Sequence, residues 1–370
     1  MKYYIIAGEA SGDLHGSNLI MELKQRDHEA DIRCWGGDKM EAAGAVLVKH
    51  YRDLAFMGFI EVIKNLPTIF KNLAFCKKDI TNFKPDVVVL IDYPGFNLRM
   101  AKWIKQEGYK IVFYISPQVW AWKENRVNII KATVDKMLVI LPFEKEFYKK
   151  WNYEVEYVGH PLIEVIDEFN SRHYNQNPSS PKNIIALLPG SRKQEIEKKL
   201  PIMLSVVKHF PAYEFIVAKA PSLPTAFYNE ILKGYPAVKT MENKTYNLLS
   251  VSTAALVTSG TATLETALFK VPEIICYKGS SVSYQIAKRL IKIKFIGLVN
   301  LIMNKEVVKE LIQDELSEDN LLKELGLILK DKDKQNKIQA DYAALYNLLS
   351  AGGHASAKAA DAILRLIKPL

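Results

Sequence analysis

The chain has 370 residues, more than one hydrophobic core usually supports, so we expect two domains. Its hydrophobic fraction of 49% and charged fraction of 25% are those of a globular protein and exclude a disordered or fibrous one. The formal net charge of +9 suits nucleic acid, anionic lipid and phosphorylated substrates alike.

Cys34, Cys76 and Cys276 are widely separated and odd in number, which favours reduced thiols in a cytosolic protein over a disulfide framework. The apolar run Tyr3–Ala7 near the N-terminus is too short for a signal peptide and predicts a buried strand. No stretch approaches the ~20 apolar residues that span a bilayer. We therefore expect no integral membrane protein, while a protein resting on the membrane surface remains open.

In the first half of the chain, short β-branched runs alternate with segments of helical periodicity. This alternation predicts parallel βαβ units and an α/β fold. The predicted strands are Tyr3–Ala7, Ile32–Trp35, Asp86–Ile91, Lys110–Ile115, Lys136–Leu141 and Glu156–Val158, and the predicted helices are Leu14–Lys24, Ile60–Phe83 and Asn97–Glu107.

Residues 171–182 are polar and rich in turn formers, as a linker between domains is. A second α/β series follows, and after about residue 304 the periodicity predicts helices only. We expect an N-terminal domain over residues 1–170, a second over 183–345, and a C-terminal helix over 346–370 that is placed to pack back on the first. The predicted strands are Asn183–Leu188, Glu214–Ala218, Ala254–Val257 and Glu273–Tyr277, and the helices are Gln194–His209, Thr261–Phe269, Lys305–Gln313, Glu318–Leu329, Lys334–Leu349 and Ala355–Ile367.

The first motif, GEASGDLHG at residues 8–16, is a glycine-rich turn between a predicted strand and a predicted helix. Backbone N–H groups at such a turn can approach an anion or a sugar hydroxyl. Its spacing differs from the GxGxxG of dinucleotide enzymes, which argues against hydride transfer. Glu9, Ser11 and Asp13 add polar groups, although Ser11 or Asp13 would serve equally well as a helix cap.

The second motif, VVVLIDYPGFN at residues 87–97, is an apolar strand that ends in Asp92. An acid at the carboxyl end of a buried parallel strand points toward the ligand crevice, where a general base is expected. The alternative is an aspartate that accepts backbone hydrogen bonds in the following turn.

The third motif, SPQVWAW at residues 116–122, follows the next strand and places Trp120 and Trp122 close to Gln118. Indole rings stack on sugar faces or fill a core. Because both tryptophans stand in a loop after a strand, we favour a binding role.

Two motifs in the second half suit a nucleotide diphosphate. LLPGSRKQEI at residues 187–196 places Arg192 at a helix start, where the guanidinium fork and the helix N-terminus both favour phosphate over a plain surface role. In SGTATLE at residues 259–265, small residues allow close backbone approach and the glutamate can accept from ribose hydroxyls. The predicted site comprises Arg192, Ser259, Gly260, Thr261 and Glu265.

Three weaker signals remain. The DKD triplet at residues 331–333 formally matches the DxD of metal-dependent sugar transferases, but it lies among lysines between helices, so we interpret it as a solvated helix start and predict no metal. His160 before a proline suits a ligand contact and a hinge equally well. Residues 60–78 and 283–298 mix basic and apolar side chains, which suits an anionic membrane or an ordinary half-buried helix.

Taken together the motifs resemble the lipid A disaccharide synthase family. They occur in the family's order from residue 7 to about 316, and they include LPFEKEFY at 141–148, VGHP at 158–161 and NKEVVKELIQDEL at 304–316. The resemblance implies a GT-B architecture of two facing Rossmann-like domains and an inverting glycosyl transfer. The implied donor is UDP-2,3-diacylglucosamine, the acceptor 2,3-diacylglucosamine 1-phosphate (lipid X), and the product a β(1→6)-linked disaccharide 1-phosphate.

By position, the resemblance makes Asp92 the general base that deprotonates the acceptor 6-hydroxyl. It assigns the acceptor side to Glu9, Ser11, Asp13, Gln118 and Trp120. It assigns UDP to Arg192, Ser259, Gly260, Thr261, Glu265 and Asn300, with no metal or other cofactor.

Both substrates carry acyl chains, so the resemblance implies an enzyme peripherally bound to the cytoplasmic face of the inner membrane. It leaves a homodimer open. The alternatives are another GT-B protein, such as a UDP-N-acetylglucosamine transferase of peptidoglycan synthesis or a UDP-sugar epimerase, and a basic nucleic-acid-binding module. No recognisable motif for nucleic acid accompanies the charge, so we expect no such partner.

Overall fold

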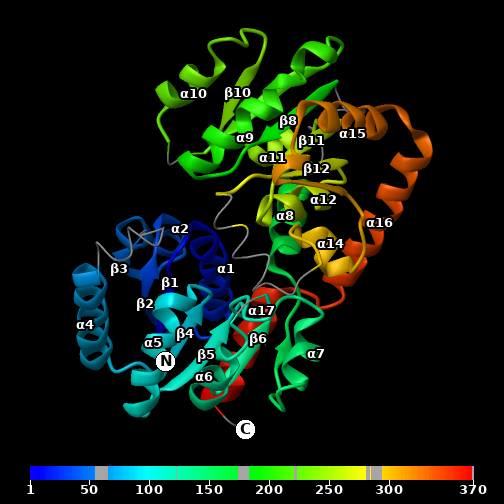
Figure 1. The fold of residues 1–370 in the computed structure, drawn as a ribbon. Helices are drawn as coiled ribbons and strands as arrows, with labels where there is room; N and C mark the ends of the chain where they lie inside the picture. Colours follow the sequence, from blue (N-terminus) through cyan, green and yellow to red (C-terminus); the bar gives the residue numbers. More distant parts are fainter. Residues whose placement is uncertain are drawn as a thin grey trace. The chain divides into compact units, whose positions relative to one another are not determined.

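The computed structural model divides the chain into two compact units, Met1–Pro161 with Leu349–Leu370, and Leu162–Leu348. Each unit is built on one parallel sheet with helices packed against it (Figure 1). Among the described residues no helix is both long and apolar enough to cross a membrane. The structure describes residues 1–54, 66–121, 123–173, 183–220, 223–280, 284 and 294–368, so Trp122, residues 60–65 of the expected helix, residues 174–182 of the linker and most of segment 283–298 lie outside it.

Unit 1 contains a seven-stranded sheet with the order β3-β2-β1-β4-β5-β6-β7, and every pairing is parallel. Central strands of such sheets are buried on both faces, which explains the unbroken VVVLI of β4. The strands are β1 Lys2–Ala7, β2 Asp31–Gly36, β3 Val46–His50, β4 Val87–Ile91, β5 Lys110–Tyr114, β6 Lys136–Val139 and β7 Glu156–Tyr157.

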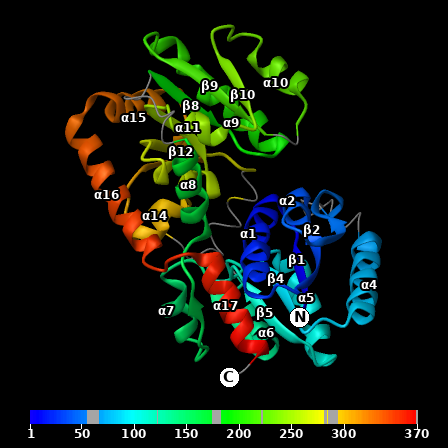
Figure 2. The same cartoon turned by 180° about the vertical axis from the view of Figure 1, so that it is seen from behind.

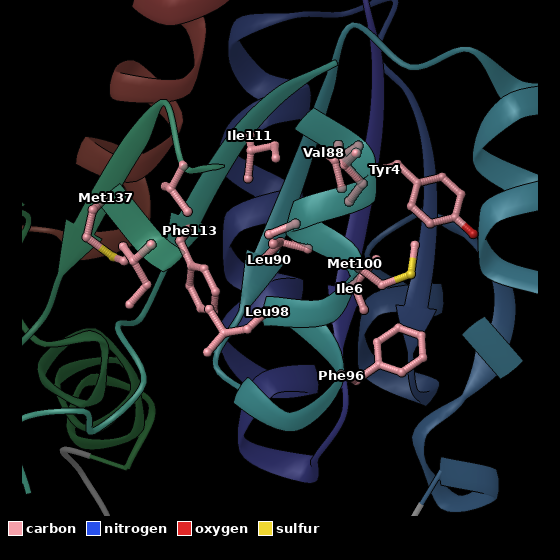
Figure 3. Close-up of a cluster of buried hydrophobic side chains, with 14 of the residues drawn as sticks. Tyr4, Ile6, Val88, Leu90, Phe96, Leu98, Met100, Ile111, Phe113 and Met137 are labelled. Atoms are coloured by element: carbon pink, nitrogen blue, oxygen red, sulfur yellow. The ribbon is translucent and has the colours of Figure 1, made fainter. Parts of the chain in front are cut away.

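The two faces of this sheet carry different helices. Tyr4, Ile6 and Val88 point to the face covered by α4, α5 and α6, where they join the main core of the unit (Figure 3). Helices α1 and α17 pack against each other, and α17 also contacts β5 and β6 (Figure 2). The helices are α1 Ala10–Arg26, α2 Asp38–Ala42, η1 Tyr51–Leu54, α4 Leu66–Phe83, α5 Pro94–Gln106, α6 Arg126–Thr133, α7 Glu144–Lys149 and α17 Ala355–Ile367.

The C-terminal segment is anchored to unit 1 by specific contacts. Arg26 Nε in α1 donates to Asp361 Oδ1 in α17 at 2.6 Å. Gly159 has a φ of +95°, and a Cβ at this position would lie 2.7 Å from the carbonyl oxygen of Gly353. A glycine is required at position 159 because two backbone segments meet there without room for a side chain. His160, the next residue, is buried, and burial together with the nearby His15 lowers its pKa to about 3.

Unit 2 contains a six-stranded parallel sheet with the order β10-β9-β8-β11-β12-β13. Its strands are β8 Ile184–Leu188, β9 Glu214–Lys219, β10 Lys239–Glu242, β11 Ala254–Thr258, β12 Glu273–Tyr277 and β13 Lys309–Ile312. Its helices are α8 Pro161–Arg172, α9 Lys193–Ser205, η3 Val207–His209, α10 Thr225–Leu232, α11 Thr245–Leu249, α12 Thr261–Leu268, α14 Leu298–Met303, η4 Gln313–Glu315, α15 Glu318–Lys330 and α16 Lys332–Ser350.

Three edge strands differ from the sequence prediction. The expected helix Lys305–Gln313 is wrong, because Lys309–Ile312 forms β13 and pairs in parallel with β12. The apolar spacing there is helical, but the unpaired edge of β12 offers the backbone a tertiary partner that outweighs local propensity. Strand β10 was not predicted, since its side chains are largely exposed and leave no apolar run in the sequence. Strand β3 was also not predicted; it begins with the short apolar run VLV, and most of its side chains are only partly buried.

Candidate functional site

The motifs that carry Glu9, Asp92, Arg192 and Gly260 lie where each sheet reverses its strand order. In unit 1 the chain runs outward from β1 to β3 and then returns to the other side of β1 to form β4. Glu9 therefore follows β1 and Asp92 follows the adjacent strand β4. In unit 2 the adjacent strands β8 and β11 stand in the same relation. Open α/β sheets bind ligands outside the carboxyl ends of the strands at these reversal points.

The turn that carries Asp92 is strained and held in place. Asp92 and Tyr93 have φ values of +43° and +49°, a left-handed region that is unfavourable for residues with side chains. The Asp92 N–H donates to the Ile115 carbonyl at 3.3 Å, and Asn97 Nδ2 donates to the Asp92 carbonyl at 2.8 Å. Gly8 contributes by its size, since a Cβ there would lie 2.3 Å from the Tyr93 ring. The neighbouring segments thus hold the backbone of the Asp92 turn in place.

The surroundings of Asp92 raise its pKa to a value at which it exchanges a proton near neutral pH. Burial, and then the nearby carboxylate of Glu9, raise the pKa of Asp92 to about 7. Both effects disfavour the charged form of the carboxyl group. A general base is most effective when its pKa lies near the working pH, so this site suits removal of a proton from a hydroxyl.

Asp13, a predicted acceptor residue, has an evident structural task. Its side chain is 3% exposed, and its carboxylate accepts hydrogen bonds from Gly37, Lys39 and Met40 N–H at 2.8, 3.2 and 3.0 Å. These are the free N–H groups at the start of α2, so Asp13 caps that helix from a neighbouring one. Ser11, by contrast, is exposed.

We expect Asp13→Ala to lower the free energy of unfolding by about 2 kcal/mol, because three N–H donors lose a charged acceptor. Urea unfolding measures this difference. Ser11→Ala on the same helix is the control and should change stability by less than about 0.5 kcal/mol. Equal stability of the two variants would contradict the capping role.

The SPQVWAW segment is joined to the LPFEKEFY segment by side-chain contacts. Trp120 is 9% exposed, and its indole Nε1–H donates to Glu144 Oε1 at 3.2 Å. Glu144 also accepts from Leu141 N–H at 2.9 Å, and the Trp120 ring meets Phe143 edge to face. Gln118 remains exposed. The sequence analysis did not predict this contact, because neither segment carries a residue pattern that identifies the other as its partner.

The unit 2 site is formed by two adjacent loops. Gly190, after β8, has a φ of +110°, and a Cβ there would lie 2.7 Å from Glu195 Oε2. Arg192 then occupies the N-cap position of α9; its side chain is 58% exposed, and its Nη1 lies 3.4 Å from Glu195 Oε1. After β11, Ser259 leads to Gly260, whose φ of +132° opens α12 at Thr261. Two helix N-termini and one arginine thus converge at the carboxyl ends of neighbouring strands, which favours an anion.

The two remaining predicted UDP residues have internal partners. Glu265 accepts a hydrogen bond from Tyr246 OH at 2.8 Å, and burial raises its pKa. Asn300 is fully buried, and its amide joins α14 to β13 by accepting from Val307 and Val308 N–H and donating to Glu310. The structure therefore places Asn300 beneath the surface, where it holds the chain that follows β12.

The DKD triplet is a helix start. Asp331 Oδ1 accepts from Asp333 and Lys334 N–H at 3.0 Å each and caps α16. Across the described residues, no three His, Cys, Asp or Glu side chains are grouped to hold a metal ion.

Two doubly wound units with candidate ligand sites at the strand-order reversals define a GT-B-type protein, the class that includes glycosyltransferases and nucleotide-sugar epimerases. The fold is similar to that of UDP-GlcNAc 2-epimerase from Neisseria meningitidis, with a TM-score of 0.70 and 13% identity over 99% of this chain and 100% of that one. It is similar to the glycosyltransferase of kitacinnamycin, with a TM-score of 0.67 and 13% identity over 99% of both chains. At this identity the likeness concerns the fold alone.

The sequence model of the lipid-A-disaccharide synthetase family matches residues 3–364. Lipid-A-disaccharide synthases from Geobacter metallireducens and Syntrophus aciditrophicus are 38% and 39% identical, each over 98% of this chain and 96% and 97% of their own lengths. The chain belongs to this family. It is a glycosyltransferase that forms the lipid A disaccharide, which sets it apart from the peptidoglycan transferase, epimerase and nucleic-acid-binding alternatives.

Proposed function

We propose that the enzyme condenses UDP-2,3-diacylglucosamine with 2,3-diacylglucosamine 1-phosphate. Asp92 removes the proton from the acceptor 6-hydroxyl as this oxygen attacks the donor anomeric carbon, and UDP leaves from the opposite face with inversion. Glu9, Ser11 and Gln118 line the acceptor side. Arg192, Ser259, Gly260, Thr261 and Glu265 hold UDP. Asp13 and Trp120 stabilise neighbouring segments of unit 1, and Asn300 stabilises the segment at residues 307–310 of unit 2.

The observation that carries this proposal is the Asp92 carboxyl, held at the end of β4 with its pKa raised to about 7. The surrounding charge is also suitable. Arg99 in α5 is close enough to Tyr93 and to Arg126 to influence the pKa of each. Arg99 beside the Asp92 turn, with Arg126 as its neighbour, suits the 1-phosphate of the acceptor.

The UDP leaving group gains negative charge as the glycosidic bond breaks. In unit 2 the N-termini of α9 and α12 and the Arg192 guanidinium offer fixed positive charge for it. These groups supply the stabilisation that a metal ion gives in other sugar transferases, so we propose that the reaction needs no metal.

The test is an assay in detergent micelles with both substrates, run without added metal and with EDTA, that follows UDP and the disaccharide product. We expect equal rates with and without EDTA. UDP binding without disaccharide formation would contradict the proposed substrates, and loss of activity in EDTA would contradict metal independence.

We also propose that the enzyme works on the surface of the inner membrane, at its cytoplasmic face, because both substrates are acylated. Helix α4 exposes Phe70 by 65% and Phe75 by 45%, alongside basic residues such as Lys71 and Lys78. Exposed aromatic side chains among lysines suit insertion at an anionic interface.

We expect Phe70→Ser to lower binding to vesicles of phosphatidylglycerol and phosphatidylethanolamine about fivefold in a co-sedimentation assay, because less apolar surface enters the interface. Met21→Ser is the control, since Met21 is 47% exposed but lies on α1, on the other face of the sheet. Equal binding by both variants would contradict a membrane contact through α4.

A further inference from the structure

A buried lysine lies beneath the two loops of the unit 2 site. Lys199 belongs to α9, and its side chain is only 3% exposed. Its Nζ donates to Thr258 Oγ1, and Thr258 is the last residue of β11, directly before Ser259 and Gly260. The Thr258 methyl group would in turn lie 3.2 Å from a Cβ on Gly190. Thr258 thus supports both loops, and Lys199 holds Thr258.

The charge of Lys199 is incompletely balanced. Its Nζ lies 3.9 Å from Glu195 Oε2, while Oε1 of the same carboxylate lies 3.4 Å from Arg192 Nη1. Two cations therefore share one carboxylate, and the Tyr277 ring, 5.9 Å from Nζ, adds only a weak attraction.

Burial lowers the pKa of Lys199, which shows the cost of keeping this ammonium away from water. Replacement of buried ionic groups by apolar side chains of similar volume is often neutral or stabilising, so stability alone does not account for this buried ammonium. Its presence at the anion-binding edge of the sheet is explained if an anionic ligand supplies the missing charge.

We propose that Lys199 is a positioning residue of the donor site, one that fixes the Ser259–Gly260 loop through Thr258 and provides positive charge beneath the diphosphate. This inference rests on the proposed binding of UDP by unit 2. It assigns to Lys199 the preference for a nucleoside diphosphate over the uncharged nucleoside, because only the diphosphate brings the compensating charge.

The experiment compares the wild type, Lys199→Met and Lys198→Met. Lys198 is the matched control, since it is the preceding residue of the same helix and is exposed. Calorimetric titration measures affinity for UDP, competition measures affinity for uridine, and thermal unfolding without ligand measures stability. We expect Lys199→Met to bind UDP about tenfold more weakly than Lys198→Met and uridine equally well, because one charge-assisted contribution is lost.

Thermal unfolding separates this role from a merely structural one. Methionine has nearly the same length without the buried charge, and Glu195, which is 33% exposed, keeps Arg192 as its partner. We therefore expect unliganded Lys199→Met to unfold at or above the wild-type temperature. Equal UDP affinity of the two variants, or a parallel loss of UDP affinity, uridine affinity and stability in Lys199→Met, would overturn the inference alone. A wild type that fails to bind UDP would overturn the proposed donor as well.

Discussion

An Asp92→Asn enzyme is expected to fold and to bind UDP normally while its kcat falls about a thousandfold, the usual loss when a general base is removed. In the wild type, kcat/KM should rise with pH up to about 7, because Asp92 accepts a proton only in its deprotonated form and its pKa is about 7. The asparagine variant should lack this acidic limb. Steady-state rates measured from about pH 5 to about pH 9 test both effects.

Glu9→Gln provides a matched control for the electrostatic argument. The Glu9 carboxylate contributes to the raised pKa of Asp92, so its neutralisation should shift the acidic limb to lower pH. Asn97→Ala tests the supporting turn, since Asn97 holds the Asp92 carbonyl. Near-normal turnover by a folded Asp92→Asn enzyme would remove Asp92 from the mechanism.

Arg192→Gln is expected to raise the KM for the UDP-sugar about 30-fold, because the proposed charge-assisted contact with the diphosphate would be lost. Lys193→Gln removes the same charge from the next residue, which is 63% exposed against 58% for Arg192. We expect the control to change KM by less than about threefold, since an exposed lysine acts only through screened long-range attraction.

The distinction between contact and long-range charge is measurable by salt dependence. The effect of Lys193→Gln should vanish at high ionic strength, where the Debye length falls to about 3 Å, while that of Arg192→Gln should persist. Equal KM values for the two variants at all salt concentrations would contradict direct recognition of the diphosphate by Arg192.

Much of the site could be predicted from local sequence because strand ends in α/β proteins are marked by composition. A buried parallel strand is a continuous apolar run, and the polar residues that follow it, such as Glu9, Asp92 and Arg192, must lie at the carboxyl edge of a sheet. The same logic failed at β13, where an edge strand with helical apolar spacing is decided by its pairing with β12.

The sequence does not reveal what a polar side chain does once it is buried. Asn300 and Trp120 are predicted to touch ligand, and the structure adds that their polar atoms donate to Glu310 and Glu144, from segments brought together only by folding. Lys199 stands in a run of charged residues and resembles its exposed neighbour Lys198. The two lysines differ only in the folded structure: α9 directs the side chain of Lys199 inward and that of Lys198 to solvent, because successive residues of a helix point in different directions.

The sequence by itself determined the class of fold, the identity of the loops and the chemistry that they can supply, since these depend on local periodicity and residue type. The tertiary structure decided which loops are neighbours. Strand order places β4 beside β1 and β11 beside β8. This pairing buries Asp92 and brings Glu9 close to it, which together raise its pKa, and it sets Thr258 beside Gly190. Hydrogen bonds between strands distant along the chain fix that order, and the local sequence of a strand does not identify its partner strand.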